Sequence, residues 1–455
     1  MNKRRWWNGG CVTPVFLAAV AVSRAQTFTT LVNFNVTNGA NPTHVSLVQG
    51  TDGNFYGTTY YGGAYNYGTI FGMSPDGRLT TLHSFQQSDG AYPIAGVIQG
   101  ADGTFYGTTY QGGTNGSGNI FAFMPGGALT ILHTFTGSDG AYPFGGLVQA
   151  ANWVFYGTTS NGGAYGFGTV YKITSDGTFT AVHSFDGTDG GNSIAGLVQA
   201  ADGAFYGTTY DGGANYGPGT IFAVTSGAFA TIYNFGGPDG SNPAAGLMQA
   251  ANGALYGTTY FGGTNDLGTI FAMAPGGNLK TLHSFGGPDG EYPFAGLVQA
   301  TNGALYGTTW AGGANNGGTI LKITPAGTLT TLYSFDADGL PQGGLLQATD
   351  GNFYGTTQED GTSSAGTVFR LNVGLGPFVK TLPASGPVGH VIKILGTDLT
   401  GATSVSFNGT AAAFAVNSTG TSISTTVPVG ATTGPVQVVT PSSTLSSNAP
   451  FRVLP

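Results

Sequence analysis

Three acidic side chains stand at positions where other repeats carry uncharged residues, and they are the first candidates for chemistry. Glu291 occupies a position that holds Ala91 in an earlier repeat, and Glu359 and Asp360 fall where other repeats have small uncharged residues. Glycoside hydrolysis requires two carboxyl groups flanking the bond that is cleaved, so these are the acids to test in an enzyme acting on polysaccharide. The alternative, which we favour, is that they are solvated surface acids, because acidic side chains are mostly exposed.

A second set of carboxylates recurs once per repeat, each directly before a glycine: Asp89, Asp139, Asp189, Asp239 and Asp289. Carboxylates bind Ca²⁺, but usually several ligands come from one loop. Each of these loops offers one main carboxylate. We therefore treat them as weak metal candidates, expect turns in which the aspartate accepts backbone N–H groups, and expect no cofactor.

Tyrosines are frequent in the long segments between predicted strands: Tyr61, Tyr65, Tyr67, Tyr92, Tyr142, Tyr165, Tyr216 and Tyr292. Aromatic faces beside amide groups, with few charges, suit sugars, other polymers or peptides. The competing interpretation is that these rings pack between structural units, since large aromatic side chains usually bury area. The sequence leaves both interpretations open.

Four histidines recur at one position of the repeat: His83, His133, His183 and His283. Other copies carry Tyr233, Tyr333 and Asn33 there, and residues one repeat apart are too distant to share a metal ion. We expect each histidine to make a hydrogen bond within its own repeat, to hydroxyls of the Thr58 type.

The elements that hold these residues follow from a repeat of about 50 residues, marked by Tyr-Gly-Thr-Thr at Tyr56, Tyr106, Tyr156, Tyr206, Tyr256, Tyr306 and Tyr354. Each unit contains four runs rich in aromatic, Thr and branched residues, bounded by Gly, Asp and Asn, as strands and turns are. In the second repeat these runs are 96–100, 105–110, 119–123 and 129–135. Four short antiparallel strands in such a period are typical of a propeller blade.

The count of strands predicts how the repeats close. The seventh repeat ends after its third strand, whereas the chain begins with an isolated strand of the fourth type at 28–34. That strand would complete the last blade and remove exposed sheet edges. We therefore predict an all-β chain in which residues 27–373 form a seven-bladed β-propeller closed by an N-terminal strand. Residues 376–455 differ in composition and predict a small Ig-like β-sandwich.

The repeats resemble the tandem repeat named after Gloeobacter and Verrucomicrobia, through GLVQAxDGxFYGTT, GGxxxxGTIF and LHSFxGxDGxxP. The tail resembles an IPT/TIG domain, through the segments 385–389, 394–399, 401–409 and 427–428. The first resemblance implies a secreted or surface protein and brings no established activity. The second implies an extracellular spacer or binding unit.

The N-terminus predicts export. Residues 1–25 read as a signal peptide, with a basic start, an apolar run too short to span a bilayer, and small residues before Gln26. An uncleaved interfacial anchor is the alternative. Removing residues 1–25 leaves 8 basic side chains against 20 acidic ones, a net charge of about −12, and removes Cys11, the single cysteine. We expect no nucleic-acid partner, no transmembrane segment in the mature chain, and no thiol chemistry.

These observations favour a secreted or cell-surface protein that is not an enzyme, binding an extracellular glycan, polymer or protein through the long loops. Carbohydrate is the ligand that we expect. A hydrolase or lyase acting on polysaccharide and a purely structural envelope protein are the alternatives, and fold alone does not separate them.

Overall fold

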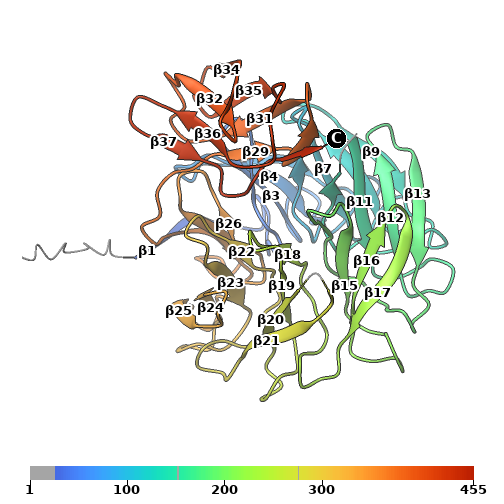
Figure 1. Cartoon of the computed structure of the whole chain (residues 1–455). Coiled ribbons are helices and arrows are strands. Elements are labelled where there is room, and N and C mark those ends of the chain that lie inside the picture. Colours follow the sequence, from blue (N-terminus) through green and yellow to red (C-terminus); the bar gives the residue numbers. More distant parts are fainter. Residues whose placement is uncertain (1–25, 151–152, 275, 455) are drawn as a thin grey trace, which may run out of the picture.

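The computed structural model describes residues 26–150, 153–274 and 276–454, and all 38 elements in this part of the chain are strands. Seven four-stranded antiparallel sheets, here called repeat sheets 1 to 7, surround a common centre, and a smaller C-terminal unit lies beside them (Figure 1). The fold is all-β and propeller-like. The predicted signal peptide, residues 1–25, lies outside the described residues.

Repeat sheet 1 runs from the centre outward in chain order as β2 (Val48–Gln49), β3 (Phe55–Thr59), β4 (Thr69–Met73) and β5 (Leu79–Ser84). The next two repeat sheets are β6 (Ile98–Gln99), β7 (Phe105–Thr109), β8 (Asn119–Phe123), β9 (Leu129–Thr134), then β10 (Val148–Gln149), β11 (Val154–Thr159), β12 (Thr169–Thr174), β13 (Phe179–Ser184). Repeat sheets 4 and 5 are β14 (Val198–Gln199), β15 (Phe205–Thr209), β16 (Thr220–Thr225), β17 (Ala228–Asn234), then β18 (Met248–Gln249), β19 (Leu255–Thr259), β20 (Thr269–Met273), β21 (Leu279–Ser284). Repeat sheet 6 is β22 (Val298–Gln299), β23 (Leu305–Thr309), β24 (Thr319–Ile323), β25 (Leu329–Ser334).

Repeat sheet 7 joins the two ends of the repeated region. It contains β26 (Leu346–Gln347), β27 (Phe353–Thr357) and β28 (Thr367–Asn372), and its fourth strand is β1 (Thr27–Asn33). β1 pairs antiparallel to β28, with Thr27 opposite Asn372 and Asn33 opposite Thr367. This pairing confirms the prediction that the N-terminal strand completes the last repeat.

Neighbouring repeat sheets are held together by buried aromatic and aliphatic side chains. Tyr106 of β7 lies against Phe155 of β11 with ring centroids 4.2 Å apart, and Tyr156 continues to Phe205 at 4.0 Å. The pattern closes between the last and first repeats, where Phe55 lies 4.2 Å from Tyr354. A four-stranded sheet exposes two faces, so each sheet becomes stable only when both neighbours cover it.

A second set of contacts links the inner ends of the sheets. The Gln99 side-chain oxygen accepts the backbone N–H of Thr51 in the preceding repeat at 2.9 Å, and the same bond joins Gln49 to Thr349 across the closure at 3.0 Å. The Thr58 hydroxyl donates to the carbonyl of Ala95 in the next repeat at 3.0 Å. These bonds satisfy backbone groups that the two-residue inner strands leave unpaired.

The C-terminal unit follows a linker near residue 374 and contains two four-stranded sheets, with strand orders β29-β31-β35-β34 and β33-β32-β36-β37. Their bounds are β29 (Lys380–Leu382), β31 (Val391–Leu395), β32 (Ser404–Phe407), β33 (Thr410–Ala412), β34 (Phe414–Val416), β35 (Ser422–Thr426), β36 (Val436–Val439) and β37 (Thr444–Ser446). A parallel pair, β30 (Ser385–Pro387) and β38 (Arg452–Leu454), completes the unit. Its own apolar core includes Ile394, Phe407 and Val438.

This C-terminal unit sits on the rim formed by the turns between the first two strands of the repeats. Thr421 donates its hydroxyl to the Thr51 carbonyl at 3.0 Å, and the hydroxyls of Thr349 and Thr397 lie 2.9 Å apart. On the opposite side of the ring, the Arg452 guanidinium donates to the carbonyls of Ala200 and Ala201 at 2.8 and 2.7 Å. The unit therefore reaches from repeat sheets 7 and 1 across to repeat sheet 4.

The described residues contain no helix with the length and apolarity required to cross a bilayer.

The close approach of the segments that precede the inner strands gives a test of this arrangement. A Cβ atom added to Gly96 would lie 2.3 Å from the Ser46 carbonyl oxygen, a backbone atom that cannot move aside. We expect Gly96→Ala to lower the free energy of unfolding by about 1–3 kcal/mol through overpacking. The control is Gly276→Ala, where no atom lies within 4 Å of the added Cβ. Thermal denaturation measures both, and equal melting temperatures for the two variants would contradict the close approach.

Candidate functional site

A central channel is lined by the segments that lead into the inner strands of all seven repeat sheets, and it contains a cavity of about 320 Å³. The side chains that enter it come from one equivalent position in six of the seven repeats: His44, Phe144, Ile194, Ala244, Phe294 and Gln342. This volume falls at the lower end of the range seen for small-molecule pockets. The channel is the candidate functional site because it is where the repeats converge.

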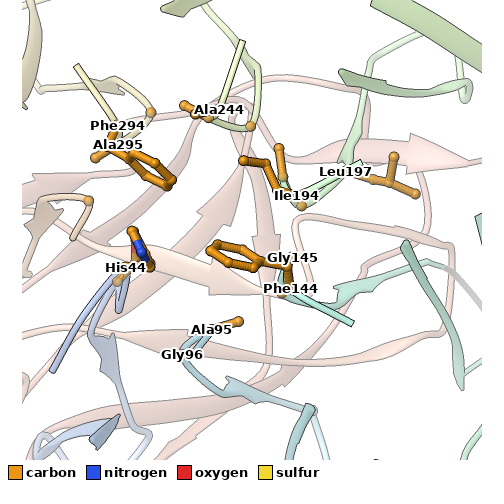
Figure 2. A pocket seen from close by; sticks show the side chains of 18 of the residues that line it. His44, Ala95, Gly96, Phe144, Gly145, Ile194, Leu197, Ala244, Phe294 and Ala295 are labelled. Atoms are coloured by element: carbon orange, nitrogen blue, oxygen red, sulfur yellow. The ribbon is translucent and has the colours of Figure 1, made fainter. Parts of the chain in front are cut away.

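His44, Phe144 and Phe294 meet across the channel, although they come from repeats 1, 3 and 6 (Figure 2). The imidazole centroid lies 4.2 Å from the Phe294 ring and 5.1 Å from the Phe144 ring. The His44 side chain is partly exposed to the channel, but its Nδ1 atom is enclosed. Desolvation by burial lowers the pKa of His44 to about 3, so its imidazole is neutral at physiological pH.

Two polar atoms in the channel wall have no protein partner: Nδ1 of His44 and Oε1 of Gln342 are enclosed and make no hydrogen bond. Buried polar atoms are nearly always hydrogen-bonded, so each such atom requires an explanation. Because both atoms are enclosed, a water molecule or a ligand hydroxyl in the channel reaches them only after the imidazole or the amide turns about its last side-chain bond.

Aromatic side chains flank the channel mouth on the side opposite the C-terminal unit. Tyr60 follows β3 and contacts Tyr61 and Tyr92, with ring centroids 4.4 and 5.1 Å apart, and Tyr67 lies 5.7 Å from Tyr92. Burial raises the pKa of Tyr60 to about 12, and the neighbouring tyrosines add to this shift. The Tyr60 phenol is therefore a neutral hydrogen-bonding group at physiological pH.

A larger aromatic cluster follows β19 and β23 on another part of the mouth. Tyr260 contacts Phe261 at 4.5 Å, Tyr292 at 5.2 Å and Phe294 at 5.5 Å. Trp310 stacks beyond Tyr260 at 6.2 Å, and its buried indole Nε1 has no hydrogen-bond partner. This cluster runs directly into the channel, because Phe294 is also the ring that contacts His44.

Between these clusters lie Tyr110 with Tyr142, at 5.2 Å, and a polar sector at repeats 4 and 5. In that sector the Asp211 carboxylate accepts the side-chain amides of Asn192 at 3.2 Å and Asn242 at 3.1 Å. Aromatic faces and a planar amide–carboxylate group thus share one rim of the channel.

The backbone holds the aromatic rim under strain. Tyr92, Tyr142 and Tyr292 have φ angles of 58°, 57° and 55°, in the left-handed region that residues with side chains seldom adopt. Backbone bonds fix this conformation: the Tyr92 N–H donates to the Tyr67 carbonyl at 2.8 Å, and the Tyr110 N–H donates to Tyr92 at 3.1 Å. The equivalent residues of the other four repeats, Asn41, Asn192, Asn242 and Leu340, also have positive φ angles, so this conformation is a property of the repeat.

The structure divides the tyrosines that the sequence proposes as a ligand site. Tyr61, Tyr67, Tyr92, Tyr142 and Tyr292 belong to the rim clusters. The other three are well exposed, although Tyr65 belongs to the same loop as Tyr61 and Tyr67: Tyr65 at 53%, Tyr165 at 64% and Tyr216 at 68%.

Sequence reasoning did not propose several residues of the rim and channel as ligand contacts: Tyr60, Tyr110, Phe144, Tyr260, Phe294, Trp310 and Gln342. A signal for part of this set exists. The residue after Tyr-Gly-Thr-Thr is Tyr60, Tyr110, Ser160, Tyr210, Tyr260, Trp310 and Gln358 in successive repeats, which is an aromatic position with interruptions.

The acids proposed for catalysis lie apart from the channel wall. Glu291 pairs through its backbone with Ala311, Glu359 is exposed, and Asp360 accepts the N–H of Gly361 at 2.7 Å. Among the contacts of the described residues, none joins Glu291 to Glu359 or Asp360.

The repeated aspartates each hold a loop together by two contacts. In repeat 1, Asp89 accepts the backbone N–H of Gln86 at 2.7 Å and contacts His83 Nε2 at 3.2 Å. The same pair recurs at Asp139–His133, Asp189–His183 and Asp289–His283, and Asp239 accepts the Tyr233 hydroxyl. The expected bond from these histidines to Thr58-type hydroxyls is therefore wrong, because the Thr58 hydroxyl is directed to the next repeat instead.

Within residues 26–150, 153–274 and 276–454, no three His, Asp or Glu side chains form a group that could hold a metal ion. The Asp89-type carboxylates remain weak metal candidates, since their oxygen atoms already have protein partners.

The sequence matches the Gloeobacter/Verrucomicrobia repeat over residues 19–217 and again over residues 193–423. No curated protein matches the chain. Two solved structures share its architecture. Virginiamycin B lyase from Staphylococcus aureus has a TM-score of 0.54 and 15% identity, covering 76% of this chain and 99% of the lyase. A fungal alcohol oxidase of the AA5 family, in complex with copper, has a TM-score of 0.53 and 13% identity, covering 94% and 99%. At these identities the likeness concerns the fold alone.

The low pKa of His44 predicts a pH dependence of stability. The unfolded chain takes up a proton at this residue below about pH 6.5, whereas the folded chain does so only near pH 3. Stability should therefore fall as the pH drops through this window. His44→Asn removes the titration, and asparagine tolerates the φ angle of 55°.

We expect the wild-type melting temperature to fall further between pH 7 and pH 4 than that of His44→Asn. Carboxylates and the other histidines are common to both chains, so the difference isolates His44. An equal fall in the two chains would show that the imidazole titrates normally.

Proposed function

The chain belongs to the Gloeobacter/Verrucomicrobia repeat family, and we propose that it is a secreted or cell-surface protein that binds carbohydrate at the channel mouth without catalysing a reaction. The single observation that carries this proposal is the rim itself. Aromatic clusters around Tyr60 and Tyr260 flank the mouth of a water-accessible channel, and the Asp211 carboxylate with its two asparagine amides lies between them.

Carbohydrates present two kinds of surface, and the rim complements both. The C–H faces of a sugar ring are apolar and pack on aromatic faces, whereas its hydroxyls need donors and acceptors in fixed directions. The uncharged phenols of Tyr60 and Tyr260 supply both functions. The planar Asn192–Asp211–Asn242 group adds amide and carboxylate positions beside them.

We further propose that the seven repeat sheets are the blades of a seven-bladed β-propeller and that the C-terminal unit is an Ig-like sandwich of the IPT/TIG type. The pairing of β1 with β28 supports the first part. The two four-stranded sheets around one apolar core support the second. Because the C-terminal unit occupies one rim of the ring, the aromatic rim on the other side is the face left for a ligand.

Export is part of the same proposal. The basic start, short apolar run and small residues before Gln26 support a signal peptide. A secreted chain with no cysteine after residue 25 gains its stability from packing and hydrogen bonds, and both are extensive here.

A glycan array probed with residues 26–455 tests the binding. We expect binding that Tyr60→Ala and Trp310→Ala each weaken about tenfold or more, because each substitution removes an aromatic face from the rim. Tyr165→Ala is the matched control, since that ring is 64% exposed on an outer loop.

The variants also decide where the ligand binds. If Tyr165→Ala abolishes binding and the rim variants retain it, the outer loops are the site. An array with no bound glycan, together with binding to a panel of peptides, would replace carbohydrate by protein as the ligand.

A further inference from the structure

We infer that the channel recognises the terminal residue of an uncharged glycan chain, through a polar stripe formed by His44, Ser46 and Gln342. This inference rests on the proposed function and makes it specific: the chain would end inside the protein instead of passing over its surface. The inference follows from the polar residues that only repeats 1 and 7 carry, from the position of the C-terminal unit, from the uncharged lining of the cavity, and from two polar atoms that lack hydrogen-bond partners.

The polar stripe is a local break in the symmetry of the channel wall. At the position of Ser46 the six other repeats have glycine, namely Gly96, Gly146, Gly196, Gly246, Gly296 and Gly344. At the position of His44 and Gln342 the other repeats have Ile94, Phe144, Ile194, Ala244 and Phe294. All three polar side chains therefore belong to repeats 1 and 7.

These two repeats are neighbours, so the stripe is continuous. The segments that precede β2 and β26 touch closely there: a Cβ atom on Gly344 would lie 2.4 Å from the Ser46 hydroxyl oxygen, and one on Gly343 would lie 2.3 Å from the Val45 carbonyl. One wall of the channel thus carries an imidazole, a hydroxyl and an amide. Phe144 and Phe294 face this wall and supply apolar surface (Figure 2).

The far end of the channel is covered. The C-terminal unit is anchored at Thr51 and Thr349 on one side of the ring and at Ala200 and Ala201 on the other. Strands of this unit lie behind the channel when it is viewed from the mouth (Figure 2). Because these anchors lie on opposite sides of the ring, the C-terminal unit spans the far end of the channel, and we expect an unbranched chain to enter from the aromatic rim by its end.

The charge of the wall selects an uncharged ligand. None of the residues that line the cavity is acidic, lysine or arginine, and His44 is neutral at physiological pH. A uronic acid or a sulfated sugar would lose its hydration without gaining a cationic partner, which is strongly unfavourable. Hydroxyl groups meet no such penalty.

Two polar atoms of the channel wall lack hydrogen-bond partners, and hydroxyl groups are suitable partners for them. Gln342 Oε1 is an acceptor without a donor, and His44 Nδ1 donates or accepts according to its tautomer. Both atoms are enclosed in this structure, so we expect the His44 imidazole and the Gln342 amide to turn toward the channel, where adjacent hydroxyls of one terminal residue would pair with them. Ser46 is exposed within the channel and offers a third hydrogen-bonding group.

The test uses isothermal titration of residues 26–455 with four uncharged hexasaccharides: maltohexaose, cellohexaose, mannohexaose and chitohexaose. Each sugar that binds is titrated again in two blocked forms, one reduced to the alditol at the reducing end and one carrying a bulky O-benzyl group at the other end. We expect one of the two blocked forms to bind at least tenfold more weakly than the free sugar.

A matched variant tests the stripe itself. Ser46→Gly with Gln342→Ile converts both positions to residues that other repeats carry, so the fold is expected to remain intact, as its melting temperature will show. We expect this variant to lose at least tenfold in affinity for the free sugar and to lose the difference between free and blocked forms. His44 gives an independent readout, because its ring proton signal, assigned with His44→Asn, should shift when the sugar is added.

The outcomes separate the inference from the proposed function. If a hexasaccharide binds but both blocked forms bind equally well, or if the double variant binds as tightly as the wild type, chain-end recognition is overturned while binding at the rim stands. If none of the four hexasaccharides binds and the array is also blank, the proposed function fails and the inference fails with it.

Discussion

Contact between the faces of adjacent repeat sheets is the constraint on which the whole structure depends. A four-stranded sheet has two faces to cover and about 50 residues in which to do so, and each repeat places a tyrosine against the next repeat's Phe or Leu. The contacts from Tyr106 to Phe155 and from Tyr156 to Phe205 repeat this solution. Because every sheet needs two neighbours, the first and last must also meet, and the contact of Phe55 with Tyr354 meets that requirement.

Closure of the ring of repeat sheets creates the channel. The wall of the channel departs from its regular apolar pattern at repeats 7 and 1, which closure brings together. The seven segments that lead into the inner strands converge, and the glycines at their closest approach leave room for backbone and little else. A regular ring of this kind would present the same wall on every side. The wall differs where repeats 7 and 1 meet, through His44, Ser46 and Gln342. The strand pair that closes the ring, β1 with β28, lies at the outer edge of repeat sheet 7, away from this polar part of the wall.

The two rims of the ring also differ from each other, in the length of their loops and in what they contact. The short turns at Thr51, Ala201 and Thr349 form a flat surface on which the C-terminal unit rests through hydrogen bonds. The longer loops on the other rim are held by the His83–Asp89 type of contact and carry the strained Tyr92 and its equivalents. Structural contacts on the outside of each loop therefore fix the aromatic side chains that face the mouth.

The sequence by itself determined what depends on near neighbours in the chain: the all-β class, the four strands of each repeat, and the N-terminal strand that completes the last one. It also indicated the long loops in which Tyr61, Tyr92 and Tyr292 lie. Only the tertiary structure decided that His83 pairs with Asp89 and not with a threonine hydroxyl, and that Tyr165 stays outside the rim. Nor did any local pattern bring His44, Phe144 and Phe294 together. Phe144 and Phe294 are 100 and 250 positions from His44 in the sequence. Their contacts with the imidazole depend on how the sheets are arranged around a common centre, and no pattern within a single repeat encodes that arrangement.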